Sequence, residues 1–444
     1  MLYLLWKRKG LLFLGQQSGE NMREFINILD EKGLLIKVKK AVNVKYEIST
    51  IMKMLDGKPI LFEKVKNFDM PVAANICSTR DLVALGLDIK QNDLISKLAD
   101  AIDNPKEPKK GEAKNYEEIS PDMTKIPVLT YYPSDGGPYI ASGVIVANDN
   151  EFGINASYHR MMVIGKDRIV MRILPRHFNK FLERGNKEFA ICIGNPMSVT
   201  IAAAVSAELE KSELSIANAL KETNLIEVGG HKVPEAEIIM IAEITNEMHD
   251  EGPFLDVTET PDIVRKQKVA KIKKIFTKKN PVFHALLPGG LEHKILMGMP
   301  KEPTIFREVN KVCECKDVLI TPGGCSWLHA AVSIKKKKSD DGRKAIEAAF
   351  KGHKSMKHVW VVDDDINIHN PDEIEWAMAT RFQGDKDMIV MQKQKGSSLD
   401  PSSNLETRET TKIGFDLTIP SDRNEQDFKK LPLPMKLRVE DYLE

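Results

Sequence analysis

Cysteine is scarce in this sequence. The chain has 444 residues and only five cysteines, Cys77, Cys192, Cys313, Cys315 and Cys325. So few cysteines at irregular spacing cannot form the disulfide framework that stabilises small secreted proteins. Cys313 and Cys315 flank a single residue, a spacing that fits neither a CxxC redox motif nor a zinc knuckle. We therefore expect a protein of the reducing cytoplasm with structural cysteines.

Long apolar runs are also missing. Lys7, Arg8 and Lys9 divide the apolar start of the chain into runs far shorter than a membrane span requires. We interpret residues 1–21 as an extension outside the fold, because the pattern of an amphipathic helix begins at Met22. Lysine plus arginine (65) nearly equals aspartate plus glutamate (64), so no overall field attracts nucleic acid or an anionic membrane.

No glycine-rich phosphate loop is present. The sequence contains neither a GxGxxG motif nor a Walker loop, and Gly289-Gly290 and Gly323-Gly324 have the context of isolated turns. The common nucleotide-binding signatures are therefore excluded.

The chain is long enough for several hydrophobic cores. Its 42% hydrophobic and 29% charged residues are typical of a globular protein of two or three domains. We predict an α/β (α+β multidomain) protein, because strand and helix patterns alternate at both ends and strands dominate the middle. The predicted parts are an N-terminal α/β domain over 22–117, a strand-rich central domain over 118–300 and a C-terminal α/β domain over 301–444.

One stretch of the central region places polar groups on an expected strand. Asn155-Ala-Ser-Tyr-His-Arg160 lies among apolar runs at 142–147, 161–164 and 169–174, which polar turns separate. Such runs predict an antiparallel meander. An amide and a guanidinium on one strand could form a chemical site. An ordinary sheet with a surface Arg160 and a turn Asn155 explains the same residues.

Glu213 interrupts an apolar pattern. Val205, Leu209, Ile216 and Leu220 recur at helical spacing, and Glu213 falls among them. A carboxylate that points into a core must be paired or ligated, because an isolated buried charge is too costly. Two interpretations stay open, a salt bridge to a neighbouring lysine or a metal ligand.

Two acids bracket a turn further along the chain. Glu251-Gly-Pro-Phe-Leu-Asp256 has a carboxylate on either side of Gly-Pro. On a straight strand these side chains would face opposite ways, and the turn is what could let them converge. Paired carboxylates suit proton delivery, because burial or a neighbouring charge raises a carboxyl pKa. Two solvent-facing loop acids are the alternative.

Together these segments resemble the UbiD family of decarboxylases, which use prenylated FMN. Asn155 to Arg160 resembles the family's Asn-x-x-x-Tyr-Arg element, and Glu251 to Asp256 is similar to its acid loop. His177 follows Arg176 as the family's histidine follows a strand, and Ser212-Glu213 resembles its helical Ser-Glu. Further similar segments are Val361–Ile366, Glu375–Ala377, Thr380-Arg381 and Lys412–Asp416. The order of these elements makes the resemblance specific from Met22 onward.

The resemblance implies a central split β-barrel that binds prenylated FMN. It assigns Asn155, His177 and Glu213 to a divalent metal, usually Mn²⁺, that bridges to the flavin phosphate, with K⁺ as a further candidate ion. Amide oxygen, imidazole and carboxylate are sensible ligands for Mn²⁺. The cofactor-binding residues that it implies are Asn155, Ser157, Tyr158, Arg160, Arg176, His177, Ser206 and Glu213.

The resemblance also implies a catalytic trio, Arg160, Glu251 and Asp256. Loss of CO₂ from an unsaturated carbon needs an electron sink, which the cofactor supplies. Arg160 would steer the substrate carboxylate and pair with Glu251, while Asp256 would protonate the carbon. Leu255 replaces the family's usual glycine and His159 replaces its tyrosine, so the shape of the substrate is in question.

Length and a composition rich in Lys, Ile and Glu resemble archaeal family members of the modified mevalonate route. That resemblance implies decarboxylation of trans-anhydromevalonate 5-phosphate to isopentenyl phosphate. His159, Arg176 or Lys180 could supply the positive charge that binds the substrate phosphate. It also implies a flavin prenyltransferase that supplies the cofactor, and a homo-oligomer (dimer or hexamer) with an oligomerisation tail in 301–444. The alternatives are an aromatic or polyprenyl-hydroxybenzoate decarboxylase, a flavin-dependent oxidoreductase and a noncatalytic assembly protein.

Overall fold

The computed structural model describes residues 21–404, 406–431, 434–435 and 442. They form two compact units, divided between Pro303 and Thr304. The predicted extension lies outside the described residues except for Asn21, whose side chain accepts a hydrogen bond from the Glu24 N–H and caps α2 (Met22–Glu31). Within these residues, no helix has both the length and the apolar character to cross a membrane.

A four-stranded sheet opens the first unit. Its order is β1 (Ile36–Val38), β2 (Ile60–Phe62), β3 (Val72–Ala74) and β18 (Phe283–Ala285). β18 comes from far along the chain and pairs with β3 in parallel. Strands that are more than 200 residues apart in the sequence are therefore neighbours in this small sheet. Helices of this unit include α3 (Glu47–Met54), α4 (Arg80–Leu87), α5 (Leu94–Asp103), α6 (His177–Glu183) and α9 (Leu291–Gly298).

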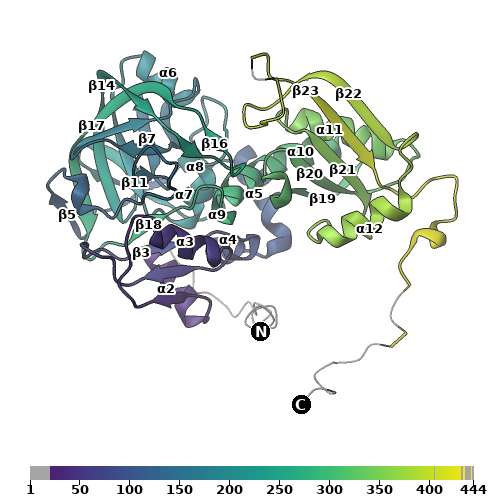
Figure 1. Cartoon of the computed structure of the whole chain (residues 1–444), viewed down its shortest axis with the longest axis horizontal. Helices are drawn as coiled ribbons and strands as arrows, with labels where there is room; N and C mark the ends of the chain where they lie inside the picture. The colour runs from purple at the N-terminus through teal and green to yellow at the C-terminus, as the bar shows by residue number, and fades with distance from the viewer. Residues whose placement is uncertain (1–20, 405, 432–433, 436–441, 443–444) are drawn as a thin grey trace. The chain divides into compact units, whose positions relative to one another are not determined.

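A nine-stranded antiparallel sheet is the largest element of the first unit. Its strand order is β6-β9-β10-β17-β14-β11-β7-β8, and β5 also pairs with β17. The longest strands, β14 (Ile238–Glu251) and β17 (Arg265–Lys278), run side by side (Figure 1). Apolar residues fill nearly every position of β11 and of the first half of β14, so both faces of the sheet are covered there. The other strands are β5 (Tyr116–Ile119), β6 (Tyr139–Ile140), β7 (Val144–Asp149), β8 (Gly153–Tyr158), β9 (Met161–Val163), β10 (Arg168–Met171) and β11 (Glu188–Ile193).

The hairpins β7–β8 and β9–β10 occupy different ends of this sheet. No described strand pair joins β8 to β9, so the predicted continuous meander is wrong at that point. Only His159 and Arg160 connect the end of β8 to the start of β9. Three Cα–Cα steps span at most roughly 11 Å. Because β8 ends the strand order and β9 lies near its other end, the sheet must roll until its two ends nearly meet.

The rolled sheet is not a closed barrel. Among the described strands, no hydrogen-bonded pair links β8 to β6 or β9, so the sheet stays open along one seam. In place of the expected split barrel, the structure has a rolled, open sheet. The mixed α/β multidomain class is confirmed. Asn155 on β8 and Arg160 after it lie at this seam.

Two helices replace the single helical stretch expected around Glu213. α7 (Met197–Ala202) ends well before α8 (Glu213–Leu220), and no helix covers the residues between them. The predicted stripe that joined Val205 and Leu209 to Glu213 is therefore wrong. The Ser212 hydroxyl accepts a hydrogen bond from the Leu214 N–H and caps α8. Glu213 lies in the first turn of a helix that packs against β8.

The second unit is built on a five-stranded sheet in the order β19-β20-β21-β23-β22. The alternation of strands and helices that the sequence predicted for this end of the chain is confirmed. α10 (Glu302–Asn310) begins in the first unit and continues into this one. The remaining elements are β19 (Glu314–Ile320), β20 (His329–Lys335), α11 (Asp341–Gly352), β21 (His358–Asp363), α12 (Pro371–Arg381), β22 (Met388–Lys395) and β23 (Glu409–Asp416).

Short strands complete the first unit. A three-stranded sheet runs in the order β13 (His231–Pro234), β12 (Asn224–Val228) and β4 (Lys109–Lys110). A small hairpin of β15 (Phe254–Leu255) and β16 (Pro261–Asp262) lies between β14 and β17 in the sequence. This hairpin carries the acid loop.

Candidate functional site

Arg160 is the centre of a cluster of three carboxylates. Its Nε and Nη2 each donate to one oxygen of Glu251, both at 2.9 Å. Nη1 donates to Asp256 Oδ2 at 3.3 Å, and Nη2 also donates to Asp262 Oδ2 at 2.8 Å. A two-point arginine–carboxylate pair fixes both position and orientation. The structure thus brings the predicted catalytic trio together.

Glu251 ends β14 and is fully buried. The Tyr139 hydroxyl donates to Glu251 Oε1 at 3.1 Å, so both carboxylate oxygens have partners. The Phe254 ring lies 4.6 Å from the Tyr139 ring and 4.8 Å from the Arg160 guanidinium carbon. This aromatic wall keeps water away from the Arg160–Glu251 pair and strengthens it.

Asp256 follows β15 and is the more accessible acid. Its side chain is 18% exposed, against 0% for Glu251. One oxygen makes the long contact with Arg160, and the other accepts a hydrogen bond from the Val257 N–H at 2.7 Å. Asp256 therefore has access to solvent that the fully buried Glu251 lacks.

Asp262 joins the cluster although the sequence analysis did not select it. Arg265 Nη1 and Nη2 donate to its two oxygens at 2.7 and 2.8 Å. Burial opposes ionisation, but the hydrogen bonds from Arg265 and the charge of Arg160 hold the pKa of Asp262 at about 2. Asp262 is therefore ionised at neutral pH and ties Arg160 to Arg265. The only signal in the sequence was the turn-rich segment after Asp256, which closes the β15–β16 hairpin.

Asn155 and Glu213 form a second polar centre, between β8 and α8. Asn155 Nδ2 and the Ala156 N–H both donate to Glu213 Oε2 at 2.9 Å. Both side chains are buried. Burial raises the pKa of Glu213 to about 7, because its described partners are uncharged. The structure shows no salt bridge from a lysine to Glu213, the other interpretation that the sequence left open, among the described residues.

His177, the third predicted metal ligand, is the first residue of α6 and is partly buried. Burial and the charges of Arg176 and Lys180 lower the pKa of its imidazole, which favours the neutral form that binds metals. Within the described residues, no hydrogen bond joins it to Asn155 or Glu213, and no cluster of three His, Cys, Asp or Glu side chains is arranged for a metal. A buried carboxylate without a cation, an amide oxygen and an imidazole nonetheless fit the donor set of a divalent ion.

The other residues that the resemblance assigns to the cofactor have separate surroundings. The Ser157 hydroxyl donates to Asn155 Oδ1 at 3.2 Å, and the Tyr158 hydroxyl donates to the Thr200 carbonyl at 3.2 Å. Arg176 is exposed just before α6. Ser206 is exposed in the connection between α7 and α8.

His159 and His293 flank the acid cluster. The His159 Nδ1–H donates to the Arg172 carbonyl at 3.1 Å, and burial lowers the pKa of His159 to about 4. His159 is therefore uncharged at neutral pH, so its predicted contact with a substrate phosphate would not be an ion pair. His293 Nδ1 accepts a hydrogen bond from the Gly289 N–H at 3.1 Å, and burial lowers the pKa of its imidazole, although the charge of Asp256 opposes this shift. Nothing in the sequence marked His293.

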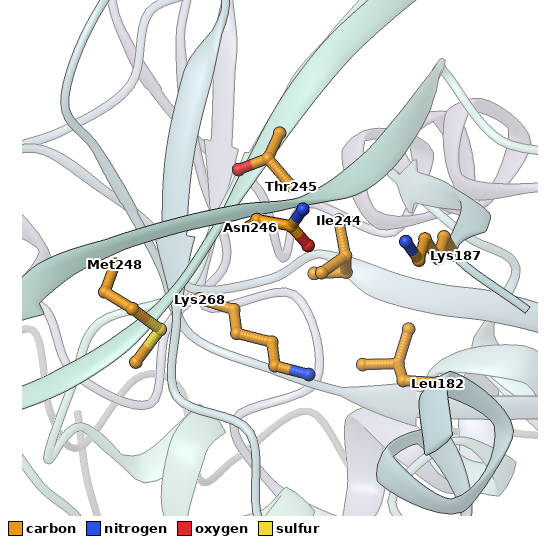
Figure 2. Close-up of a pocket in the computed structure, with 7 residues that line it drawn as sticks. All are labelled: Leu182, Lys187, Ile244, Thr245, Asn246, Met248 and Lys268. Carbon is orange, nitrogen blue, oxygen red and sulfur yellow. The ribbon is translucent and has the colours of Figure 1, made fainter. Parts of the chain in front are cut away.

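A small surface pocket lies away from these centres. Its volume is about 160 Å³, below the roughly 300 Å³ at which ligand pockets usually begin. Figure 2 shows that residues of α6, β14 and β17 surround it. Its lining residues are Leu182, Lys187, Ile244, Thr245, Asn246, Met248 and Lys268. None of the predicted site residues belongs to it, so it does not compete with the acid cluster as the reaction site.

Three family models match this chain in succession. They are the N-terminal domain, the Rift-related domain and the C-terminal domain of UbiD, 3-octaprenyl-4-hydroxybenzoate carboxy-lyase. The matches cover residues 26–102, 104–291 and 294–417. Together they span nearly all of the described residues.

Curated proteins and solved structures agree with these matches. Anhydromevalonate phosphate decarboxylase of Methanocaldococcus jannaschii is 43% identical over 94% of this chain and 100% of the relative. The protein of the same name from Methanothermobacter thermautotrophicus is 39% identical over 90% and 97%. The UbiD-class enzyme HmfF from Pelotomaculum thermopropionicum, in complex with FMN, is 32% identical with a TM-score of 0.91, covering 95% of this chain and 100% of that one. An evolved dimeric form of HmfF, in complex with prFMN, is 31% identical with a TM-score of 0.87, covering 96% and 100%. The chain therefore belongs to the UbiD family of carboxy-lyases.

Proposed function

We propose that this chain is a prenylated-FMN-dependent decarboxylase that converts trans-anhydromevalonate 5-phosphate to isopentenyl phosphate and CO₂. The relatives named anhydromevalonate phosphate decarboxylase support the substrate, and the HmfF complexes support the flavin. The observation that carries the proposal is the two-point pair of Arg160 with Glu251, 3.3 Å from a second acid, Asp256.

Arg160 binds the substrate carboxylate. A guanidinium has five N–H donors, and the described carboxylates take four of those of Arg160. The remaining Nη1–H is available to the carboxylate that leaves as CO₂. Glu251 holds the guanidinium in one orientation, so the leaving group meets a fixed donor.

Asp256 delivers the proton. When the bond between the unsaturated carbon and the carboxylate breaks, CO₂ leaves and its bonding electron pair stays with the substrate. Prenylated FMN, when bound, supplies the electron sink for that pair. Asp256 then transfers its carboxyl proton to the carbon and becomes a carboxylate next to Arg160. Its partial exposure lets it regain a proton from solvent before the next cycle.

Asn155, His177 and Glu213 would hold a divalent ion such as Mn²⁺, and the ion would fix the flavin phosphate. The buried Glu213 carboxylate, with amide N–H groups as its partners, supports this role. Ser157, Tyr158, Arg176 and Ser206 complete the proposed cofactor site, in which K⁺ is a further candidate ion.

The proposed cellular setting is the cytoplasm, where a flavin prenyltransferase supplies the cofactor. All five cysteines are free thiols, as a reducing compartment would keep them. We also infer a homo-oligomer, a dimer or hexamer, since an HmfF form is described as dimeric. The proposed domains are 22–117, 118–300 and 301–444, with residues 1–21 outside the fold.

The direct test is to coproduce the chain with a flavin prenyltransferase and to supply the phosphorylated acid. CO₂ and isopentenyl phosphate should form in equal amounts. Asp256→Asn should lower kcat by about 100-fold or more, because a positioned acid contributes on that order, and should leave the flavin content unchanged. Asp250→Asn is the matched control, because Asp250 is an exposed acid of the same strand end. Full turnover by the Asp256 variant would remove the assigned acid.

A further inference from the structure

Arg172 lies opposite Arg160 in the rolled sheet. β9 and β10 pair with Met162 opposite Val170 and Met161 opposite Met171. Extending this register by one residue pair places Arg160 opposite Arg172, and the Arg172 N–H donates to the Arg160 carbonyl at 3.3 Å. Directly opposite residues of an antiparallel pair project from one face, with Cβ atoms about 4.5–5.5 Å apart. The two guanidinium groups therefore leave the sheet on the same side.

The neighbouring strand places Arg172 beside the acid cluster. β10 pairs with β17 through Val170 and Val269, and the Ile173 N–H donates to Gln267 Oε1 at 3.1 Å. Continued by two residues, this register puts Arg172 opposite Gln267. Arg265 lies two residues from Gln267, on the same face, and is opposite Glu251 in β14. Arg172 thus projects from the same face of the sheet as Arg160, and Arg265 and Glu251 form a neighbouring cross-strand pair two residues along.

Arg172 differs from Arg160 and Arg265 in its partners. Arg160 and Arg265 are each bound to at least one carboxylate through two nitrogens. In the part of the chain that the structure describes, the Arg172 guanidinium has no hydrogen bond, ion pair or ring contact. It is only partly exposed, and burial together with the charges of Arg265 and Arg160 lowers its pKa. A partly buried cation among other cations is costly unless an anion joins it.

The position of Arg172 indicates which anion this is. Arg172 is opposite Arg160 across the β9–β10 pair and lies on the same face as Arg265 and Glu251. An anion at Arg172 would therefore be part of the molecule held at the acid cluster. The three arginines Arg160, Arg172 and Arg265 balance the three carboxylates Glu251, Asp256 and Asp262. When Asp256 carries the proton that it delivers, the cluster has one positive charge in excess, which favours a substrate that carries a phosphate in addition to its carboxylate.

We propose that Arg172 binds the phosphate of a phosphorylated unsaturated acid whose carboxylate is bound by Arg160. The inference rests on the proposed function and deepens it, because it names the residue that selects the phosphorylated substrate. Arg172 replaces His159, which is uncharged at neutral pH, in that role. The hydrogen bond from the His159 Nδ1–H to the Arg172 carbonyl holds the backbone of Arg172 in place.

Kinetics of the holoenzyme test this role. Arg172→Gln should raise KM for the phosphorylated acid about 10- to 100-fold, the range expected when charge-assisted hydrogen bonds are lost. kcat/KM for the same acid without its phosphate should stay within about twofold of the wild-type value. Arg172→Lys should recover part of the loss, because it keeps the charge without the planar fork. The control is Arg168→Gln on the same strand, since Arg168 is an exposed residue paired with Glu247.

Binding separates this inference from the proposed function. The saturated analogue of the phosphorylated acid has no double bond and cannot be decarboxylated. Titration calorimetry with this analogue therefore measures its binding affinity without turnover. Wild-type holoenzyme should bind it about 10-fold or more tightly than the Arg172→Gln variant does, at unchanged flavin content and melting temperature. Equal affinity, or no binding by the wild type, would overturn the inference. An Arg172-dependent affinity without CO₂ release by the wild type would overturn the proposed function alone.

Discussion

Gly136 lies so close to Gly252 that a Cβ atom on Gly136 would be 2.2 Å from the Gly252 carbonyl oxygen and 2.7 Å from the carbonyl carbon. The Gly136 N–H also donates to the Pro253 carbonyl at 2.9 Å. This backbone contact holds the start of the acid loop, one residue after Glu251. The position of Glu251 therefore depends on a glycine more than a hundred residues earlier in the chain.

Gly136→Ala should displace the acid loop. The added methyl group would meet backbone atoms, which cannot rotate away as a side chain can, so we expect a loss of about 1–3 kcal/mol in the free energy of unfolding and a lower kcat. Urea unfolding and steady-state decarboxylation measure both effects. Gly137→Ala is the control, because the nearest atom to its Cβ would belong to the Met162 side chain, at 3.3 Å, and the nearest backbone atom, the Val163 carbonyl oxygen, would be at an ordinary 3.6 Å. Equal behaviour of the two variants would argue against this contact as the support of the loop.

Asp262 gives a pH dependence of stability with a defined sign. Its folded pKa, about 2, lies below the ordinary value of 3.8, so its stabilisation is fully present above about pH 4 and is lost as the pH falls through about 2. After solvent screening we expect a contribution on the order of 1–2 kcal/mol. Asp262→Asn should therefore be less stable than the wild type at pH 7, and the gap should narrow below about pH 4.

Urea unfolding across that pH range checks the Asp262 prediction. Asp167→Asn is a suitable control, because Asp167 is a loop acid with only a 3.8 Å contact to Lys271. A gap between wild type and Asp262→Asn that stays constant down to the lowest measurable pH would show that the ionised carboxylate is not what stabilises the cluster.

Local patterns predicted the parts of the site that neighbouring residues determine. The Gly-Pro turn after Glu251 was sufficient to predict that Glu251 and Asp256 could converge, and the structure joins both to Arg160. Ser212-Glu213 entered the sequence analysis only through the family resemblance, and apolar spacing across Val205 and Leu209 wrongly favoured one longer helix. A cap and an apolar stripe compete as signals, and in this segment the cap determined where α8 begins.

Register across the rolled sheet determined the rest. Asp262 meets Arg160 although 102 residues separate them, and Arg172 faces Arg160 because β9 and β10 form a hairpin that extends by one pair. The crossing from β8 to β9 depends on how the whole sheet rolls, which no short window of sequence contains. The prediction of a continuous meander across β8 and β9 therefore failed, whereas the convergence of Glu251 and Asp256 depended on a single turn.

Glu213→Gln tests the second polar centre. Glutamine keeps an oxygen that can accept the hydrogen bonds from Asn155 and Ala156, but it removes the charge, so the fold should persist. If Glu213 is a metal ligand, metal affinity should fall by more than about tenfold and bound flavin should fall with it. Elemental analysis and flavin absorbance of the purified protein measure both. Glu210→Gln, at an exposed position nearby, should change neither, and full metal and flavin content in Glu213→Gln would limit Glu213 to a structural role.

Arg160→Lys separates charge from geometry at the centre of the cluster. Lysine keeps the positive charge but has one nitrogen, so it cannot donate to both oxygens of Glu251 while reaching Asp256 and Asp262. Glu251 would then stay fully buried with a single charged partner, and the substrate carboxylate would lose its oriented donor. We expect kcat/KM to fall about 100-fold or more, as misplaced catalytic groups typically cause, with flavin content retained. Arg168→Lys, on the surface of the same sheet, should behave as the wild type. A fall of less than about threefold in Arg160→Lys would mean that charge alone suffices, because the two-point geometry would then contribute little to turnover.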